Sequence, residues 1–357
     1  MSSTPLISVC IPTFNGARYL GACLDSVLNQ TMSNFEVLIV DDCSKDETLA
    51  IAREYAKRDE RIRLESNERN LGLVGNWNHC INFGRGDWIK YLFQDDMLLP
   101  ECLSRFVETM DGSEPIICCK RDFIFEDGTD EALKKWYSKL DTIETLFPNK
   151  THISAEAICE ATLQSVGRNF IGEPTAVLLH RRVFDLFGQF NPNLVMMCDS
   201  EYWTRVAIHT GITYIPETLA KFRVHATAAS SLNRSIRQYR ADILDRLVLF
   251  HDFSFNAEYQ PLREYAKHRT PPVDLNHQLK TLTREARRIA EDAAHRADTP
   301  DKKLLEEWSD HLQRYPKLRK YLNLHATDIT ATFSKTYRPL RGFLNKHYAR
   351  HIGWRFK

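Results

Sequence analysis

The sequence predicts an α/β fold with a mixed, mainly parallel central sheet, followed by an extension built only of helices. Strand and helix signals alternate through the first hundred residues, as in layered α/β proteins. From about residue 231 onward, apolar residues recur at helical spacing and strand signals end. We therefore expect a first domain over residues 1–230 (halves 1–97 and 98–230), a helical extension over 231–334 and a basic tail over 335–357.

Four short strands are expected in the first hundred residues, over 7–12, 35–40, 61–65 and 87–93. The second of these is almost entirely apolar, which is typical of a strand covered on both faces. Apolar residues spaced by three and four from Leu20 to Leu28 predict a helix, and a short helix is expected over 73–83. Ser44 and Glu47 have the spacing of a capping box, which predicts that another helix begins beside them.

The rest of the first domain continues this mixture. Strands are expected over 116–119, 123–125 and 176–179, and a helix over 155–164. Residues 130–150 show no clear periodicity, and we interpret them as a long loop or lid. In the extension, an apolar stripe predicts a long helix, and Thr299-Pro300 predicts the start of another. The stripe consists of Leu279, Leu282, Ala286, Ile289 and Ala293.

The composition excludes several classes of protein. Of 357 residues, 43% are hydrophobic and 11% aromatic, which is enough to bury a core, so the chain is not disordered. The 48 basic and 47 acidic residues nearly cancel, whereas binding to nucleic acid needs a basic excess, so no nucleic-acid partner is expected. The nine cysteines include no C-x-x-C pair, which favours reduced, buried thiols over a disulfide framework or a zinc site.

The two ends of the chain bear on its location. The N-terminus has no basic region followed by a long apolar run, and no run of about 18 apolar residues occurs, so we expect a cytoplasmic chain without a transmembrane helix. Residues 335–357 contain seven Lys or Arg, two His, five aromatics and no acidic residue, with an apolar i, i+4 row from Leu340 to Ile352. This composition predicts an interfacial helix on the anionic inner face of the plasma membrane, with a helix docked on the first domain as the alternative.

Two acidic pairs follow the ends of predicted strands. Asp41-Asp42 comes after the second strand, and Asp95-Asp96 comes after the fourth. In open α/β sheets, ligands bind outside the carboxyl ends of the strands, so this placement indicates functional carboxylates. An acidic pair can also serve as a turn or helix cap, and for Asp41-Asp42 that alternative stays open.

Four segments of the chain carry a resemblance to a known family. They are ISVCIPTFNGARYLGACLDSVLNQT, FEVLIVDDCSKDET, NLGLVGNWNHCINFGRGDWIKYLFQDD and CDSEYWTRV. In the order and spacing of these segments, over about residues 5–225, the chain resembles the family-two glycosyltransferases. The resemblance implies the GT-A fold, in which a nucleotide-binding α/β half joins an acceptor-binding half. It also implies transfer of a sugar from a nucleotide-diphosphate donor to an acceptor hydroxyl.

The resemblance assigns the donor site to the loops after the first strands. The turn after the first strand looks like the family's loop against the base and ribose, and it contains Pro12, Thr13, Phe14 and Asn15. Asp42 matches the carboxylate that accepts a hydrogen bond from the base. Arg69 opens the next loop on the donor side, where Asn70 and Gly72 match the family's N-x-G. Uridine is the most frequent base in the family, so the resemblance implies a UDP-sugar as the donor, with thymidine and guanosine nucleotides as alternatives.

Asp95 and Asp96 resemble the acidic metal motif of the family, which implies Mn²⁺ or Mg²⁺ as a cofactor. A diphosphate leaving group calls for a hard divalent cation that takes oxygen ligands. The family often carries a further Asp two residues before Asp95, and Phe93 stands there in this chain. This departure favours Asp96 as the direct ligand and turns Asp95 towards the ribose. Arg223 and His225 resemble a late basic segment near the diphosphate, where His225 is a metal ligand, a phosphate contact or a structural histidine.

Asp199 matches the general base of the family, which takes the proton of the acceptor hydroxyl, although Cys198 replaces the usual Glu before it. Inverting transfer needs one carboxylate opposite the leaving group, so a single base together with a metal suffices. The alternative is that Asp199 caps the helix that follows it. Glu173 is a further candidate, for positioning the acceptor.

Two other functions stay open. A sugar-nucleotide nucleotidyltransferase has a related α/β layout, but it needs a glycine-rich phosphate loop, and PTFNGARYL contains a single glycine. A non-catalytic saccharide-binding scaffold would not need Asp42, Asp95, Asp96 and Asp199 together. The expected acceptor is a saccharide, lipid-linked or on a cell surface, and the sequence does not define the sugar, the linkage or the oligomeric state.

Overall fold

The computed structural model describes residues 4–110, 112, 114–228, 237–295 and 302–322. The described residues up to Pro316 form one compact unit, and those from Lys317 onward belong to a second unit. Several features predicted from the sequence lie outside the described residues: the domain boundaries near 230 and 334, the helix start at Thr299-Pro300 and the basic tail over 335–357.

Within the described residues, nine strands form one sheet in the order β3-β2-β1-β4-β8-β6-β9-β5, with β7 paired to β9. The strands are β1 (Ile7–Thr13), β2 (Phe35–Asp41), β3 (Ile62–Ser66), β4 (Trp88–Tyr91), β5 (Met97–Leu98), β6 (Ile116–Phe125), β7 (His152–Ile153), β8 (Val177–His180) and β9 (Ile212–Val224). The pairs β1–β2, β1–β4, β2–β3 and β6–β9 are parallel, whereas β8 is antiparallel to β4 and β6. β6 is one strand with a register shift around Lys120, where the sequence predicted two strands. The predicted mixed, mainly parallel sheet is confirmed.

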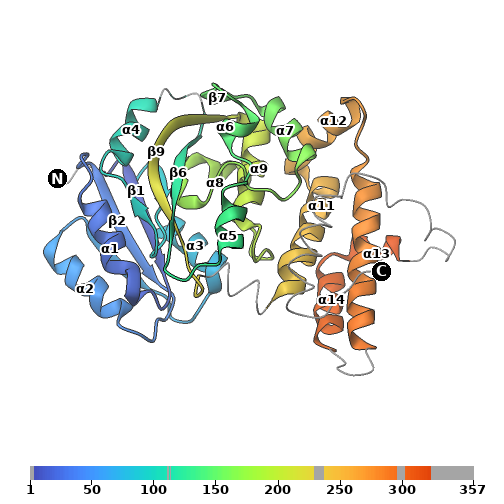
Figure 1. Ribbon diagram of the computed structural model, residues 1–357, viewed down its shortest axis with the longest axis horizontal. Helices are drawn as coiled ribbons and strands as arrows, with labels where there is room; N and C mark the ends of the chain where they lie inside the picture. Colours follow the sequence, from blue (N-terminus) through green and yellow to red (C-terminus); the bar gives the residue numbers. More distant parts are fainter. Residues whose placement is uncertain (1–3, 111, 113, 229–236, 296–301, 323–357) are drawn as a thin grey trace. The chain divides into compact units, whose positions relative to one another are not determined.

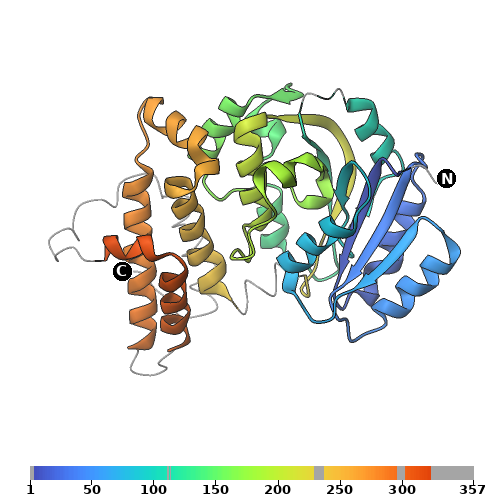
Figure 2. The same cartoon turned by 180° about the vertical axis from the view of Figure 1, so that it is seen from behind.

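Helices cover both faces of this sheet. The helices of the first 228 residues are α1 (Ala17–Leu28), α2 (Thr48–Arg58), α3 (Gly72–Phe83), α4 (Cys102–Thr109), α5 (Glu131–Tyr137), α6 (Ile143–Leu146), α7 (Ala155–Gln164), η1 (Pro174–Ala176), α8 (Arg182–Phe187) and α9 (Cys198–Thr210). Helices α1 and α2 lie on one face, and α3 lies on the opposite face against β1 and β2 (Figures 1 and 2). The predicted apolar spacing on α1 is confirmed, because Leu20, Leu24 and Val27 are fully buried.

The start of α2 differs from the prediction. The helix begins at Thr48, its N-cap residue Glu47 makes no side-chain cap hydrogen bond, and Asp46 Oδ1 accepts from Thr48 N at 3.1 Å. Ser44 instead donates to Asp41 Oδ1 at 2.5 Å and accepts from Asn15 N at 2.9 Å. The predicted capping box with Glu47 is therefore wrong, because the Ser44 hydroxyl is used to join the loops that follow β1 and β2.

Residues 130–150 contain two short helices, which corrects the prediction of an unstructured loop. α5 and α6 each begin with a side-chain cap: Asp130 accepts from the first turn of α5, and Thr142 forms a capping box in α6. Helices of this length are defined by their caps and tertiary contacts rather than by an apolar stripe. These helices are consequently too short for an apolar periodicity to reveal them in the sequence.

The extension is helical, as predicted. Its elements are the π-helix η2 (Arg240–Leu244), α11 (Asp245–Phe255), η3 (Ala257–Tyr259), α12 (Gln260–His268), α13 (Leu275–Ala294), α14 (Lys303–Arg314) and η4 (Pro316–Tyr321). The predicted stripe on α13 is buried except at Ile289, beside which Ala290 is buried instead. Helix α13 packs against α11 and α14, and α12 packs on α7 and α9 (Figure 1). Among the described helices, none combines the length and the hydropathy that crossing a bilayer requires.

The cysteines belong largely to the core. All nine are free thiols, and eight of them are buried. Burial raises the pKa of Cys102 and Cys118 well above the usual range of a thiol. The prediction of mostly buried thiols is therefore confirmed.

Candidate active site

The loops after β1 and β4 meet at the carboxyl edge of the sheet. β1 ends at Thr13, and the side chain of Phe14, 46% exposed, projects from the turn that follows. Gln94, after β4, accepts from Phe14 N at 2.9 Å and donates to Phe14 O at 3.1 Å. Of the residues predicted to contact the base and ribose, Pro12 and Thr13 are buried, whereas Phe14 and Asn15 are exposed. The exposed part of this turn is thus fixed in place by Gln94.

The first acidic pair is bound by the protein itself. The buried carboxylate of Asp42 accepts from Asn67 Nδ2 at 2.8 Å and from the backbone N–H groups of Leu71 and Gly72 at 2.7 and 2.9 Å. It thereby holds the start of α3, where Gly72 has a φ of 76° that favours glycine. Asp41 is likewise bound, to the end of β1 and to the loop after β2.

Two further predicted donor residues lie on the exposed rim of the same loop. Asn70 donates to Asp42 O at 3.0 Å and accepts from Gly72 N at 3.1 Å. The side chain of Arg69 is exposed beside it. This rim therefore presents the side-chain amide of Asn70 and the guanidinium of Arg69 to any ligand that lies across the strand ends.

The second acidic pair joins distant parts of the first domain. Asp96 is fully buried, its Oδ1 accepts from Arg223 N at 2.8 Å, and its Oδ2 accepts from the Thr175 hydroxyl. The Asp95 side chain is 18% exposed and lies 2.8 Å from His225 Nε2. Arg223 Nε also donates to the Asp95 carbonyl at 2.8 Å. The structure thus brings Asp95, Asp96, Arg223 and His225 together, as the resemblance implied.

The surroundings of Asp96 fit a site for a divalent cation. Burial, followed by the charge of Asp95, raises the pKa of Asp96 well above its usual range. A cation beside the pair would stabilise both ionised carboxylates, which are the hard oxygen ligands that Mg²⁺ and Mn²⁺ take. Among the residues that the structure describes, no group of three or more His, Cys, Asp or Glu side chains is arranged to hold a metal.

An aromatic ring from α1 packs beside this pair. The ring of Tyr19 lies 4.7 Å from the His225 ring, and the Arg223 guanidinium lies 5.0 Å from the Tyr19 ring centre. The Tyr19 hydroxyl donates to Glu126, which follows β6. Burial and this hydrogen bond raise the pKa of Tyr19 to about 12, so the hydroxyl stays protonated as a donor. Tyr19 and Glu126 belong to the site's surroundings, although the sequence did not single them out.

Asp199 is the second residue of α9. Its carboxylate accepts from Asn169 Nδ2 at 2.8 Å and from Ser200 N at 2.7 Å. Burial is the main cause that raises its pKa to about 7, and the neighbouring Glu173 adds to the rise. The N-cap of α9 is Met197 rather than Asp199, so the capping alternative is not the one that the helix uses. A carboxyl group with this pKa exchanges protons readily near neutral pH.

The short segment from Glu173 to Thr175 affects the carboxyl groups of both Asp96 and Asp199. Glu173 forms an ion pair with Arg121, and both side chains are largely buried. Two residues later, Thr175 donates to Asp96. Because Glu173 also raises the pKa of Asp199, one segment of three residues acts on both Asp96 and Asp199.

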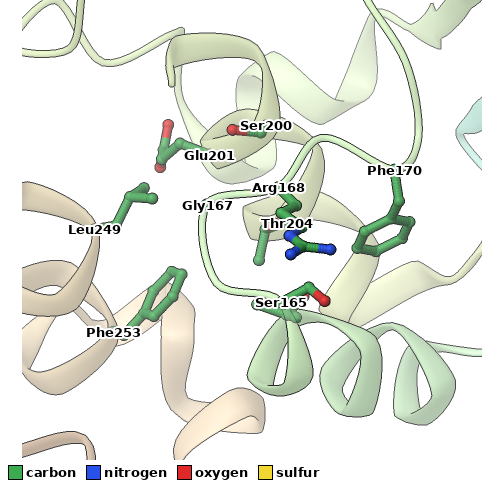
Figure 3. Close-up of a pocket in the computed structure, with 10 residues that line it drawn as sticks. Ser165, Gly167, Arg168, Phe170, Ser200, Glu201, Thr204, Leu249 and Phe253 are labelled. Atoms are coloured by element: carbon green, nitrogen blue, oxygen red, sulfur yellow. The ribbon is translucent and has the colours of Figure 1, made fainter. Parts of the chain in front are cut away.

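A small pocket lies behind this region, between the loop after α7 and the helices α9 and α11 (Figure 3). Its volume is about 10 Å³, which is room for about one water molecule. Ser200 and Glu201 line it from α9, and Leu249 and Phe253 line it from α11. The predicted site residues do not line this pocket, and it is too small for a nucleotide or a sugar.

Comparison with known proteins relates the chain to one family. Residues 8–164 match the family model described as glycosyl transferase family 2. An uncharacterized protein of Mycobacterium tuberculosis is 33% identical over 248 residues, which cover 68% of this chain and 73% of that protein. The putative glycosyltransferase EpsH of Bacillus subtilis is 26% identical over 268 residues, which cover 74% of this chain and 73% of EpsH.

Solved structures share the fold. The crystal structure of S. aureus TarS in complex with UDP-GlcNAc has a TM-score of 0.55 at 16% identity, covering 87% of this chain and 81% of that one. The mannosyltransferase PcManGT from Pyrobaculum calidifontis, in complex with GDP-Man and Mn²⁺, has a TM-score of 0.53 at 16% identity, covering 90% and 84%. With its GT-A fold and its glycosyltransferase relatives, the chain carries a glycosyltransferase family 2 domain that the family model matches over residues 8–164.

Proposed function

We propose that this glycosyltransferase moves a sugar from a nucleotide-diphosphate donor to an acceptor hydroxyl with inversion, and that Asp199 is its general base. The observation that carries the proposal is the carboxyl group of Asp199, whose pKa burial raises to about 7. Such a group is about half ionised at neutral pH and becomes largely ionised about one pH unit higher. It is also basic enough to accept a proton from a hydroxyl that is attacking a carbon centre.

In the proposed reaction, the acceptor oxygen bonds to the anomeric carbon while the bond from that carbon to the diphosphate oxygen breaks. The acceptor proton passes to the Asp199 carboxylate, and the nucleoside diphosphate leaves with the bonding electron pair. Arg223 would balance part of the charge of the diphosphate beside the second acidic pair. A bound Mn²⁺ or Mg²⁺, held by Asp96 and Asp95, would supply Lewis-acid stabilisation of the leaving oxygen.

Asp95 and Asp96 differ in access, which refines their proposed roles. The sequence favoured Asp96 as the direct metal ligand and Asp95 for the ribose. Asp96 is fully buried with both oxygens hydrogen-bonded, whereas Asp95 is partly exposed. We therefore extend the proposal so that Asp95 shares the cation with Asp96, and His225 orients the Asp95 carboxylate.

The nucleoside is proposed to lie across the loops after β1 and β2. Phe14 and Asn15 offer the exposed surface there, and Arg69 and Asn70 form the opposite rim. Asp42 supports this site from below through its bonds to the start of α3. TarS and PcManGT were solved with UDP-GlcNAc and GDP-Man, respectively, and for this chain we propose a UDP-sugar.

The acceptor is proposed to be a lipid-linked or cell-surface saccharide, met at the inner face of the membrane. The basis is the sequence of the basic tail over 335–357, with its seven cationic residues and no acidic one. Each cationic residue near an anionic leaflet contributes about 1 kcal/mol. We predict that a chain lacking 335–357 is released from anionic liposomes yet still transfers sugar to a soluble acceptor, and that 1 M salt releases the full chain. Continued sedimentation of the truncated chain with liposomes would contradict the anchoring role.

The stereochemistry of the product tests the proposed reaction. Binding of a panel of nucleoside diphosphates with Mn²⁺ identifies the base, and turnover of the matching nucleotide sugar yields a product whose anomeric configuration is read by NMR. We expect inversion. A product that retains the donor's configuration would overturn the single-base mechanism, and the absence of transfer from any donor would favour a saccharide-binding scaffold.

A further inference from the structure

The helical extension makes a specific contact just before the helix that carries Asp199. Asp245, the first residue of α11, is fully buried. Its Oδ2 accepts from the backbone N–H groups of Val195, Met196 and Met197 at 2.9, 2.6 and 3.1 Å. Helix α9 begins at the next residue, so one carboxylate from the extension binds the whole approach to that helix.

This contact fixes the backbone that leads into α9. Its N-cap residue, Met197, provides no side-chain acceptor, and successive backbone N–H groups that converge on one point form a site for an anion. Asp245 fills that site from a segment 48 residues further along the chain. The backbone conformation at the start of α9 therefore depends on the extension as well as on the local sequence.

The next turn of α9 is tied to the extension as well. Glu201 forms an ion pair with Arg205 at 2.9 Å, and its Oε1 accepts from the Tyr259 hydroxyl of η3 at 2.6 Å. Arg240 adds a third tie, because it donates to Asn193 O at 3.0 Å in the loop that leads to α9. In Figure 1, α11 lies beside α9 along this contact.

The direction of the Asp199 carboxylate depends on this backbone. One of its two hydrogen bonds comes from Ser200 N, within the first turn of α9, and the other comes from Asn169. A shift of that turn would move the carboxylate relative to Asn169 and to the acceptor. Displacement of a reacting group by about 1 Å can reduce a rate by about 10²-fold.

We propose that Asp245 is a positioning residue for sugar transfer, through which the helical extension fixes the first turn of α9 and the direction of the Asp199 carboxylate. This inference rests on the proposed function, in which Asp199 is the general base. It gives the extension a role in catalysis, because Asp245 binds the three backbone N–H groups that lead into the helix carrying the base.

A double-mutant cycle in the full chain tests the inference. Asp245→Asn replaces an acceptor oxygen by an amide that faces backbone donors, so we expect kcat to fall about tenfold while KM for the donor stays unchanged. In the Asp199→Asn background, the same substitution should change kcat less than twofold, because there is no base left to misplace. Tyr239→Phe serves as the control, since it removes a buried hydrogen bond to Ala286 O within the extension and should lower Tm without lowering kcat.

The outcomes separate this inference from the proposed function. Equal loss of kcat from Asp245→Asn in both backgrounds, or an unchanged kcat in the single variant, would overturn the positioning role. An unchanged rate in Asp199→Asn alone would instead overturn the proposed base. If Asp245→Asn does not fold, the same cycle with Asp245→Glu decides, because this variant keeps the charge and displaces the carboxylate by one methylene.

Discussion

The two acidic pairs at the carboxyl edge of the sheet share a sequence pattern and differ in environment. Donors from neighbouring loops bind both carboxylates of Asp41-Asp42, and this pair holds the turns around the start of α3. In the second pair, Asp95 contacts His225, and burial next to Asp95 raises the pKa of Asp96 well above its usual range. A position after a strand therefore does not distinguish a pair of carboxylates that fixes loops from a pair that we propose to hold a cation. The surrounding donors and charges distinguish them.

Substitution in the second pair should have the largest effect on activity. We expect Asp96→Ala to reduce transfer by at least about 10³-fold and to remove the metal-dependent part of nucleoside diphosphate binding, because it deletes a proposed oxygen ligand of the cation. Calorimetry with and without Mn²⁺ and a transfer assay measure the two effects. Asp87→Ala, an exposed acid just before β4, is the matched control and should leave both unchanged. Full activity in EDTA would show that no metal takes part.

Substitution in the first pair should act mainly on stability. In the wild type, the Asp42 carboxylate accepts hydrogen bonds from two backbone N–H groups. Asp42→Asn replaces one carboxylate oxygen by an amide N–H group, which cannot accept them. Loss of such a buried acceptor costs about 2 kcal/mol of unfolding free energy. Urea unfolding measures this loss, with Asp25→Asn on the exposed face of α1 as the control. If Asp42→Asn is fully stable but fails to bind the nucleotide, then Asp42 serves the ligand rather than the loop, and the contrast between the two pairs is lost.

A glycine next to the first pair offers the smallest and cleanest test. Gly72 has a φ of 76°, and a Cβ added there meets no atom within 4 Å, so Gly72→Ala introduces backbone strain without a clash. We expect a loss of about 1 kcal/mol in unfolding free energy and weaker donor binding, since the loop after β3 must shift. Gly128→Ala has the same kind of conformation, with a φ of 82° and open space, but lies away from the first pair. It should cost similar stability and leave donor binding unchanged.

Much of this architecture could be predicted from local sequence patterns. Strand alternation, helical spacing and the placement of acidic pairs after strands depend on neighbouring residues, so the sheet, α1 and the approximate donor edge were accessible. The order of the motifs also placed Arg223 and His225 with the second pair, and the structure brings these residues together.

The hydrogen-bond partners of the Asp96 and Asp199 carboxylates could not be predicted from local sequence patterns. Thr175 on Asp96 and Asn169 on Asp199 come from distant segments without a local motif. Asp245 binds backbone N–H groups, which leave no trace in the identities of Val195 to Met197. The wrong capping box at Ser44 has a partly local cause, because its hydroxyl donates to Asp41, three residues earlier, and accepts from Asn15 N in the loop after β1.

The role of Asp199 is the central claim, and the pH dependence of kcat/KM for sugar transfer tests it most directly. Because the pKa of Asp199 is about 7, the base form increases as pH rises through that value, so the wild-type rate should rise with pH and level off above pH 8. Asp199→Asn should be slower by at least about 10²-fold, should lack this rising limb and should bind the donor as tightly as the wild type. A variant that keeps both the rate and the rising limb would contradict the assignment of Asp199 as the general base.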